Sequence, residues 1–184
     1  ILVDCSVSMS GELTKMAEQV ALCVQFAQKT NVKVEVWGFT SSHKRNMNSK
    51  LYQITSTETK NLEKDLARFT GRMYNRREHG ILLQYTPLAM SMFTMAEVAE
   101  DFKTRNKVEK FSTIVLTDGM DNSVIEFPGQ ANPTRFFGGK IYDKKTNTLI
   151  NCSLGHVEGS FRYYKNRVGG KLIHIYLGSG MQRG

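Results

Sequence analysis

Residues 111–117, Phe-Ser-Thr-Ile-Val-Leu-Thr, are the segment that most restricts the fold of this chain. They form a nearly continuous apolar run, which is typical of strands buried on both faces of a parallel sheet. The run ends on Asp118-Gly119, a carboxylate followed by a turn residue. Parallel strands need long crossovers, usually helices, and open α/β sheets bind ligands at the carboxyl ends of their strands. The segment therefore predicts an α/β domain with a carboxylate where ligands bind.

Strand-like and helix-like patterns alternate through the rest of the chain. Apolar or alternating patterns predict further strands at residues 1–4, 32–39, 51–55 and 171–177. Apolar residues at helical spacing predict helices at residues 12–29, 57–69, 87–102 and 157–168. The loop at 41–50 is short enough for a hairpin, which leaves one antiparallel edge strand. We expect a Rossmann-like, doubly wound, mostly parallel sheet.

About fifty residues separate Asp118 from the last strand, far more than a minimal crossover needs. Residues 137–142 and 148–152 are predicted to form a β-hairpin within an insertion at about 123–170. Glycines are expected to end two helices, Gly71 after the second and Gly169-Gly170 after the last. No repeat or low-complexity linker divides the chain, so residues 1–184 are expected to form one domain whose first strand begins upstream of Ile1.

Composition narrows the function classes. The 184 residues contain no apolar run long enough to span a membrane and no recognisable signal peptide, so a cytoplasmic location is expected. Three cysteines without CxxC spacing favour buried thiols in a reducing compartment. The net charge of +8 favours a solvated basic surface over a nucleic-acid face, because no nucleic-acid-binding motif accompanies the basic clusters.

Three oxygen-bearing side chains follow the first strand in Asp4-Cys5-Ser6-Val7-Ser8. Alternate residues of an extended chain point the same way, so Asp4, Ser6 and Ser8 are predicted to converge while Cys5 and Val7 turn inward. Hard oxygen donors suit Mg²⁺, which usually keeps some of its water. The alternative is an ordinary helix N-cap, the commonest use of Ser and Asp in such a turn.

Thr86 presents the same choice at a second place. It precedes Pro87, which suits the first position of a helix, so Thr86 is expected at the N-cap, where its hydroxyl either caps the helix or faces a cation. The strand ending at Asp4, the helix beginning at Thr86 and the strand ending at Asp118 are predicted to meet at one edge of the sheet. That arrangement would bring together the oxygen donors Asp4, Ser6, Ser8, Thr86 and Asp118.

The five residues, in this order and in these elements, resemble the metal-ion-dependent adhesion site of von Willebrand factor A (vWA) domains. The resemblance spans residues 1 to about 177. Residues 2–11 and 32–40 look most like the vWA domain of the cobaltochelatase subunit that works with a AAA+ ATPase, and similar domains occur in large bacteriophages. The chain departs from the family in two places, with Val7 where a small residue is usual and with an insertion in place of a plain helix.

The resemblance implies that Ser6, Ser8 and Thr86 bind Mg²⁺ or Mn²⁺ directly or nearly so, and that Asp4 and Asp118 hold its waters. A partner protein would then add an acidic residue to the metal. The function expected from it is a non-catalytic binding module, an adaptor or subunit for a MoxR-type AAA+ ATPase, in the host cytoplasm if the source is viral.

Two other functions are weighed beside this one. The first is a subunit of an ATP-driven chelatase inserting cobalt or magnesium into a tetrapyrrole; since the chain has no GxxxxGK[ST] motif, another subunit would have to hydrolyse the ATP. The second is nucleic-acid binding through the basic clusters, which would make affinity fall steeply with salt.

Overall fold

The computed structural model describes residues 1–41, 49–74, 86–119, 121, 124–125, 134–135, 140–151 and 156–177. Their main feature is a five-stranded sheet in the order β3-β2-β1-β4-β9. The strands are β1 (Leu2–Asp4), β2 (Glu35–Ser41), β3 (Ser49–Ser56), β4 (Ser112–Thr117) and β9 (Lys171–Tyr176). Only the β2–β3 pair of this sheet is antiparallel. The predicted mixed α/β sheet with one antiparallel edge strand is confirmed.

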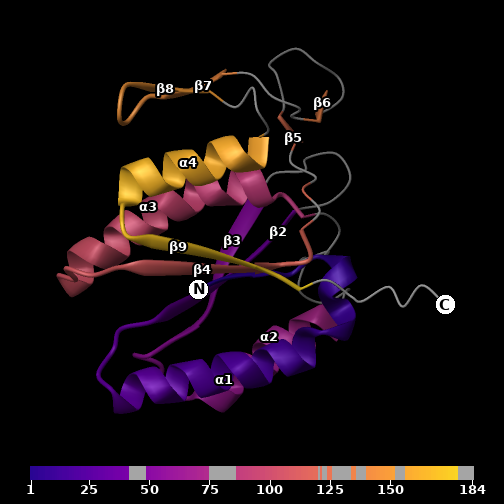
Figure 1. Cartoon of the computed structure of the whole chain (residues 1–184). Helices are drawn as coiled ribbons and strands as arrows, with labels where there is room; N and C mark the ends of the chain where they lie inside the picture. The colour runs from indigo at the N-terminus through magenta and orange to yellow at the C-terminus, as the bar shows by residue number, and fades with distance from the viewer. Residues whose placement is uncertain are drawn as a thin grey trace.

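Helices cover both faces of the sheet, α1 and α2 on one side and α3 and α4 on the other (Figure 1). Their bounds are α1 (Leu13–Lys29), α2 (Leu62–Tyr74), α3 (Leu88–Asn106) and α4 (His156–Val168). A 3₁₀ helix, η1 (Val7–Gly11), precedes α1. None of the helices in the described part of the chain combines the length and the hydrophobicity that a membrane span requires.

Alternation along the central strands supplies two cores. In β1, Leu2 packs into the core under α3 and α4, while Val3 packs into the core beside α1 and α2. Val115 of β4 is fully buried in the first core, and Val36 of β2 is fully buried in the second. Each such buried aliphatic side chain contributes about 1.5–3 kcal/mol to folding. The central strands are thus fixed from both faces, and the carboxyl ends of β1, β2 and β4 are held at one edge.

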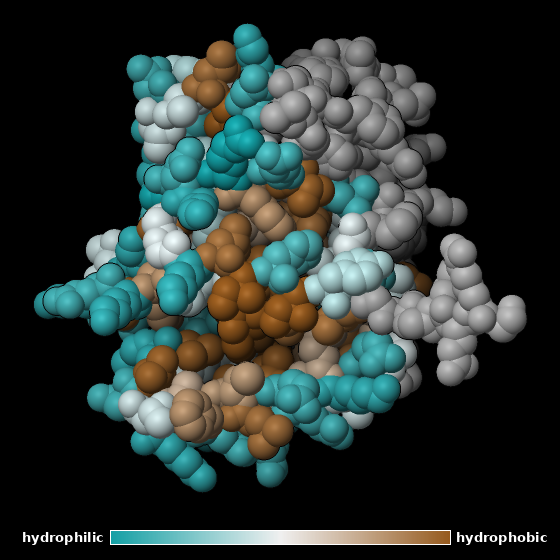
Figure 2. Space-filling view, viewed as in Figure 1, coloured by the Kyte–Doolittle hydropathy of each residue, from teal (hydrophilic) through white to brown (hydrophobic). Residues whose placement is uncertain are grey.

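Strand β9 forms the edge of the sheet opposite β3, and part of it is exposed. Ile173, Ile175 and Tyr176 are 44%, 42% and 64% exposed. Figure 2 shows apolar residues gathered across the middle of this side of the molecule, where β4 and β9 run in Figure 1. On the face opposite Ile173 and Ile175, His174 packs edge-to-face against Phe161 of α4, with ring centroids 5.1 Å apart.

The second helix begins and ends later than the sequence pattern predicts. It starts at Leu62 because Asn61 caps it, its Oδ1 accepting the Lys64 N–H at 2.9 Å, whereas Thr57 is tied to Val34. Its predicted stop at Gly71 is wrong. A Cβ at Gly71 would meet no atom within 4 Å, and glycine on an open helix surface costs only about 1 kcal/mol relative to alanine, so the helix continues to Tyr74. Strand β2 likewise starts at Glu35, where its pairing with Ser56 begins.

The predicted hairpin is present as β7 (Lys140–Asp143) and β8 (Thr148–Asn151). A second short pair, β5 (Val124–Ile125) and β6 (Thr134–Arg135), was not predicted. Arg167 of α4 connects this helix to α3 and to the β7–β8 hairpin. Its guanidinium is 5% exposed, donates twice to the Glu100 carboxylate at 2.9 and 2.8 Å, and lies 3.7 Å from Asp143.

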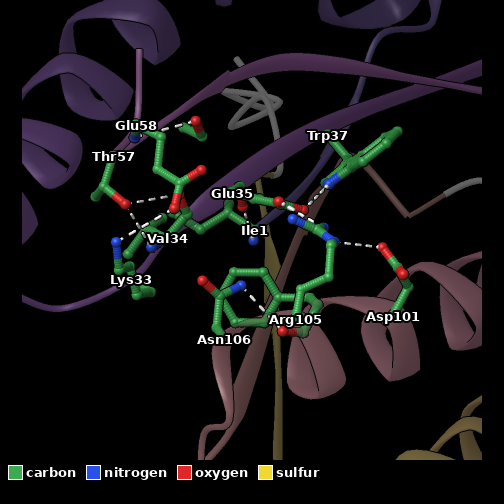
Figure 3. A network of polar contacts seen from close by, with 12 residues as sticks. Ile1, Lys33, Val34, Glu35, Trp37, Thr57, Glu58, Asp101, Arg105 and Asn106 are labelled. Carbon is green, nitrogen blue, oxygen red and sulfur yellow. Dashed lines mark hydrogen bonds and ion pairs between the residues drawn. The ribbon is translucent and has the colours of Figure 1, made fainter.

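The amino edge of the sheet carries a polar network centred on Glu35 (Figure 3). The Glu35 carboxylate accepts hydrogen bonds from Trp37 Nε1 at 3.0 Å and from Arg105 at 2.9 Å. The Ile1 amino group donates to the Glu35 carbonyl at 2.8 Å, and Arg105 also pairs with Asp101. These contacts join β1 and β2 to the end of α3, at the edge opposite the predicted site.

Candidate metal site at the carboxyl edge

Asp4 is the most buried member of the candidate site. It ends β1 between β2 and β4, and its side chain is 0% exposed. One carboxylate oxygen accepts the Ser6 N–H at 2.8 Å, and the other accepts the Thr117 hydroxyl at 2.6 Å. The pKa of Asp4 is raised from 3.8 to about 6, chiefly by burial; the hydrogen bonds from Thr117 and Ser6 oppose the rise, and the Asp118 charge adds to it. An ionised Asp4 is therefore costly in this position without a cation.

Ser6 and Ser8 converge as the sequence predicts. Their hydroxyl groups hydrogen-bond to each other, with the two oxygens 2.8 Å apart; Ser6 is 1% exposed and Ser8 lies at the surface. Cys5 is buried, but Val7 is 37% exposed, so the expectation that both turn inward is wrong for Val7. The reason is η1, which starts at Val7 and replaces the extended geometry on which that expectation relied. Ser6 occupies the N-cap of η1, yet its side chain makes no capping hydrogen bond.

Thr86 lies directly before α3 but does not cap it. The N-cap is Pro87, which corrects the prediction that places Thr86 there. The side-chain acceptor of the first turn comes from another segment, because Asp121 Oδ1 accepts the Ala89 N–H at 3.0 Å. Thr86 is 2% exposed. The Asp121 bond brings the start of α3 to the loop that follows β4.

Asp118 follows β4 in a sharp turn. Gly119 has φ +89°, which favours glycine, and a Cβ there would lie 2.1 Å from the Tyr176 ring, so that ring would have to move. The Gly119 N–H donates to Thr117 Oγ1 at 3.1 Å. Asp118 Oδ1 is buried and has no hydrogen-bond partner; among the described residues, Thr40 Oγ1 is the other such side-chain atom.

The structure thus links Asp4, Ser6 and Ser8 by direct contacts. It places Asp118 close enough to Asp4 for the Asp118 charge to raise the pKa of Asp4. It also connects the start of α3 to the same edge. The donors are oxygens of two carboxylates and three hydroxyls. No group of three or more His, Cys, Asp or Glu side chains suited to a metal occurs in the described part of the chain. This donor chemistry fits a hard cation that keeps water, such as Mg²⁺ or Mn²⁺, and not a zinc site.

A cavity of about 690 Å³ lies at the amino edge of the sheet, lined mainly by apolar side chains such as Phe26, Met95 and Phe102. It is remote from the five oxygen donors.

Sequence reasoning missed two residues at this edge, Thr117 and Asp121. Thr117 is 0% exposed and holds the Asp4 carboxylate through its hydroxyl. A polar residue at the end of an apolar strand, directly before Asp-Gly, is the signal that could have found it. Asp121 contacts a residue 32 positions away, and no local pattern marks it.

Comparisons with known proteins bear on the fold. No family model matches the sequence, and no curated protein matches it. The structure is similar to that of the pilus adhesin SpaC from Lactobacillus rhamnosus GG in its open conformation, at 16% identity and a TM-score of 0.57. The match covers 95% of this chain and 23% of the adhesin. An uncharacterized membrane-spanning protein from Vibrio fischeri matches at 15% identity, 96% and 89% coverage and a TM-score of 0.32, too low to inform the fold. The chain therefore has a mixed α/β fold similar to part of a bacterial adhesin.

Proposed function

We propose that this chain is a vWA-type protein-binding module with a Rossmann-like fold. Its Asp4, Ser6, Ser8, Thr86 and Asp118 would hold Mg²⁺ or Mn²⁺ at the carboxyl edge of the sheet. The cation would supply an electrophilic centre that takes a carboxylate from a partner protein. The hydroxyls of Ser6, Ser8 and Thr86 would bind the ion, while the carboxylates of Asp4 and Asp118 would orient its waters.

The observation that carries the proposal is the buried, unpartnered Oδ1 of Asp118 beside the buried carboxylate of Asp4. Two neighbouring carboxylates repel each other, and a buried acceptor without a partner costs about 1–3 kcal/mol. A cation with its bound waters would offset both the repulsion and the cost of the unpartnered oxygen, since the ion would neutralise the charge and its waters would donate hydrogen bonds.

The hydroxyls support the same conclusion. The alternative explanation for Ser6 and Thr86 is helix capping, and neither side chain serves it. Instead the Ser6 and Ser8 hydroxyls hydrogen-bond to each other at 2.8 Å, and Ser8 is exposed. Adjacent hydroxyl oxygens with access to solvent are suited to share one ion.

The partner would be acidic. A net charge of +8 attracts an acidic surface over long range, and few anionic ligands would leave the cation able to accept another. The similarity to an adhesin agrees with a binding role. The adaptor role for a MoxR-type AAA+ ATPase, a cytoplasmic location and a phage source rest on the family resemblance alone. No specific observation in the described residues favours the chelatase or nucleic-acid functions over this one.

Titration calorimetry with Mg²⁺ and Mn²⁺ tests the proposal. Wild type should bind one ion, and the double substitution Ser6→Ala with Ser8→Ala should weaken binding by at least about tenfold, the range expected when metal-site residues are removed. Ser10→Ala is the matched control, because Ser10 is exposed on η1 and lies outside the site. The proposal fails if wild type does not bind, or if the double variant binds as wild type does.

A further inference from the structure

The first turn of α3 takes its capping acceptor from a distant segment. The first N–H groups of a helix have no partner within the helix, and Pro87 at the N-cap has no side-chain acceptor to offer. Asp121 Oδ1 accepts the Ala89 N–H at 3.0 Å across 32 residues of sequence. A carboxylate at this end is also favoured by the helix dipole. Asp121 therefore performs the capping that the sequence assigns to Thr86.

The two ends of this hydrogen bond lie beside two candidate metal ligands. Ala89 is three residues after Thr86, and Asp121 is three residues after Asp118. The intervening backbone is constrained on the helix side, because both the N–H and the hydroxyl of Ser91 bond to the Pro87 carbonyl, at 2.9 and 2.8 Å. A displacement of Asp121 relative to α3 would therefore displace Thr86 relative to Asp118.

The constraint continues on the strand side to the other half of the site. Gly119 N–H donates to Thr117 Oγ1 at 3.1 Å, and the Thr117 hydroxyl donates to Asp4 at 2.6 Å. One series of contacts thus runs from Asp4 through Thr117 and the Asp118 turn to Asp121, and from there to the start of α3. Of these links, the Asp121 to Ala89 bond is the one that crosses from β4 to the helix.

We propose that Asp121 is a positioning residue for the metal site. It sets the distance between the Thr86 and Asp118 segments through its hydrogen bond to Ala89, without binding the cation itself. This inference rests on the proposed function. It predicts that changing Asp121 lowers metal affinity although all five candidate ligands remain, and that the geometry of the acceptor matters more than its charge.

Three substitutions and one control test the inference by Mn²⁺ calorimetry. Asp121→Ala should weaken affinity by about tenfold or more, as loss of residues that orient metal ligands does. Asp121→Asn keeps an oxygen at the same position and should stay within about threefold of wild type. Asp121→Glu keeps the charge but moves the carboxylate by one methylene, and should bind more weakly than Asp121→Asn. Asn106→Ala removes the 3.0 Å bond to the Phe102 carbonyl at the far end of α3 and should bind as wild type does.

Amide hydrogen exchange at Ala89 supplies a readout that does not depend on metal. Exchange should accelerate in Asp121→Ala and stay slow in Asp121→Asn. The inference is overturned if Asp121→Ala binds Mn²⁺ as wild type does, or if Asp121→Glu retains affinity while Asp121→Asn loses it, since charge would then be the cause. Either result leaves the proposed function intact. If wild type does not bind Mn²⁺, the proposed function and this inference both fail.

Discussion

Replacing Asp4 by Asn should stabilise the metal-free protein while abolishing its response to metal. The ionised carboxylate of Asp4 is disfavoured by burial, which raises its pKa in the folded state from 3.8 to about 6. The folded state therefore binds protons more tightly than the unfolded state, and the free energy of unfolding falls as pH rises from about 4 to about 6. This rise in the pKa of Asp4, from 3.8 to about 6, lowers the free energy of unfolding by about 3 kcal/mol above pH 6.

Asn has nearly the same shape without the charge. Its amide oxygen can accept the Ser6 N–H and its NH2 can donate to Thr117 Oγ1, so Asp4→Asn should avoid this cost. In urea unfolding without divalent cations at pH 7.5, the variant should be more stable than wild type by up to about 3 kcal/mol. At pH 3.5 the advantage should largely vanish, because Asp4 is then mostly protonated in both states. With millimolar Mg²⁺, wild type should gain stability through binding and the variant should not.

Asp143→Asn is a control of opposite sign. Hydrogen bonds from Thr146 and Tyr163 lower the pKa of Asp143 to about 2, so its charge stabilises the fold at neutral pH and that contribution is lost as pH falls toward 2. This variant should be less stable than wild type at pH 7.5. The reasoning about Asp4 is refuted if Asp4→Asn is no more stable than wild type at pH 7.5, or if any gain is equal at both pH values.

Two further predictions concern residues that stabilise the fold. Gly119→Ala should lower the free energy of unfolding in urea by about 2 kcal/mol or more, because φ is +89° and the new Cβ would overlap the Tyr176 ring. Adding Tyr176→Ala should recover only the part of the loss that is due to this overlap. Full recovery would contradict a contribution from the backbone. Arg167→Ala should lower the free energy of unfolding by about 2 kcal/mol, because the Arg167 side chain is 5% exposed and donates two hydrogen bonds to the Glu100 carboxylate of α3. Arg105→Ala should lower it by at most about 1 kcal/mol, because Arg105 is 46% exposed. Equal losses of stability for the two substitutions would show that burial does not determine how much each arginine contributes.

The sheet could be predicted because its signals are local. The apolar run at 111–117 needs burial on both faces, and the alternation in β2 and the apolar spacing in α1 each follow from one segment alone. The element boundaries were less accurate. Whether α2 starts at Thr57 or Leu62 depends on Asn61 as a cap and on the contact between Thr57 and Val34, which is a tertiary contact.

The candidate site was predictable in its residue types and not in its connections. Asp4, Ser6 and Ser8 share one turn, so their proximity follows from spacing. The role of Asp121 does not, because a hydrogen bond across 32 residues depends on how β4 and α3 are placed in space. The exposure of Val7 was mispredicted for a related reason, since the 3₁₀ turn replaces the extended backbone that the alternation assumed.

A crystal structure of the protein grown with Mn²⁺, measured at a wavelength where manganese scatters anomalously, tests the central claim most directly. The proposal predicts one strong anomalous peak at the carboxyl edge of the sheet, within bonding distance of the Ser6 and Ser8 hydroxyls, with Asp118 Oδ1 newly hydrogen-bonded to a metal-bound water. No peak at this edge, with Asp118 Oδ1 still unpartnered in saturating Mn²⁺, would contradict the proposal.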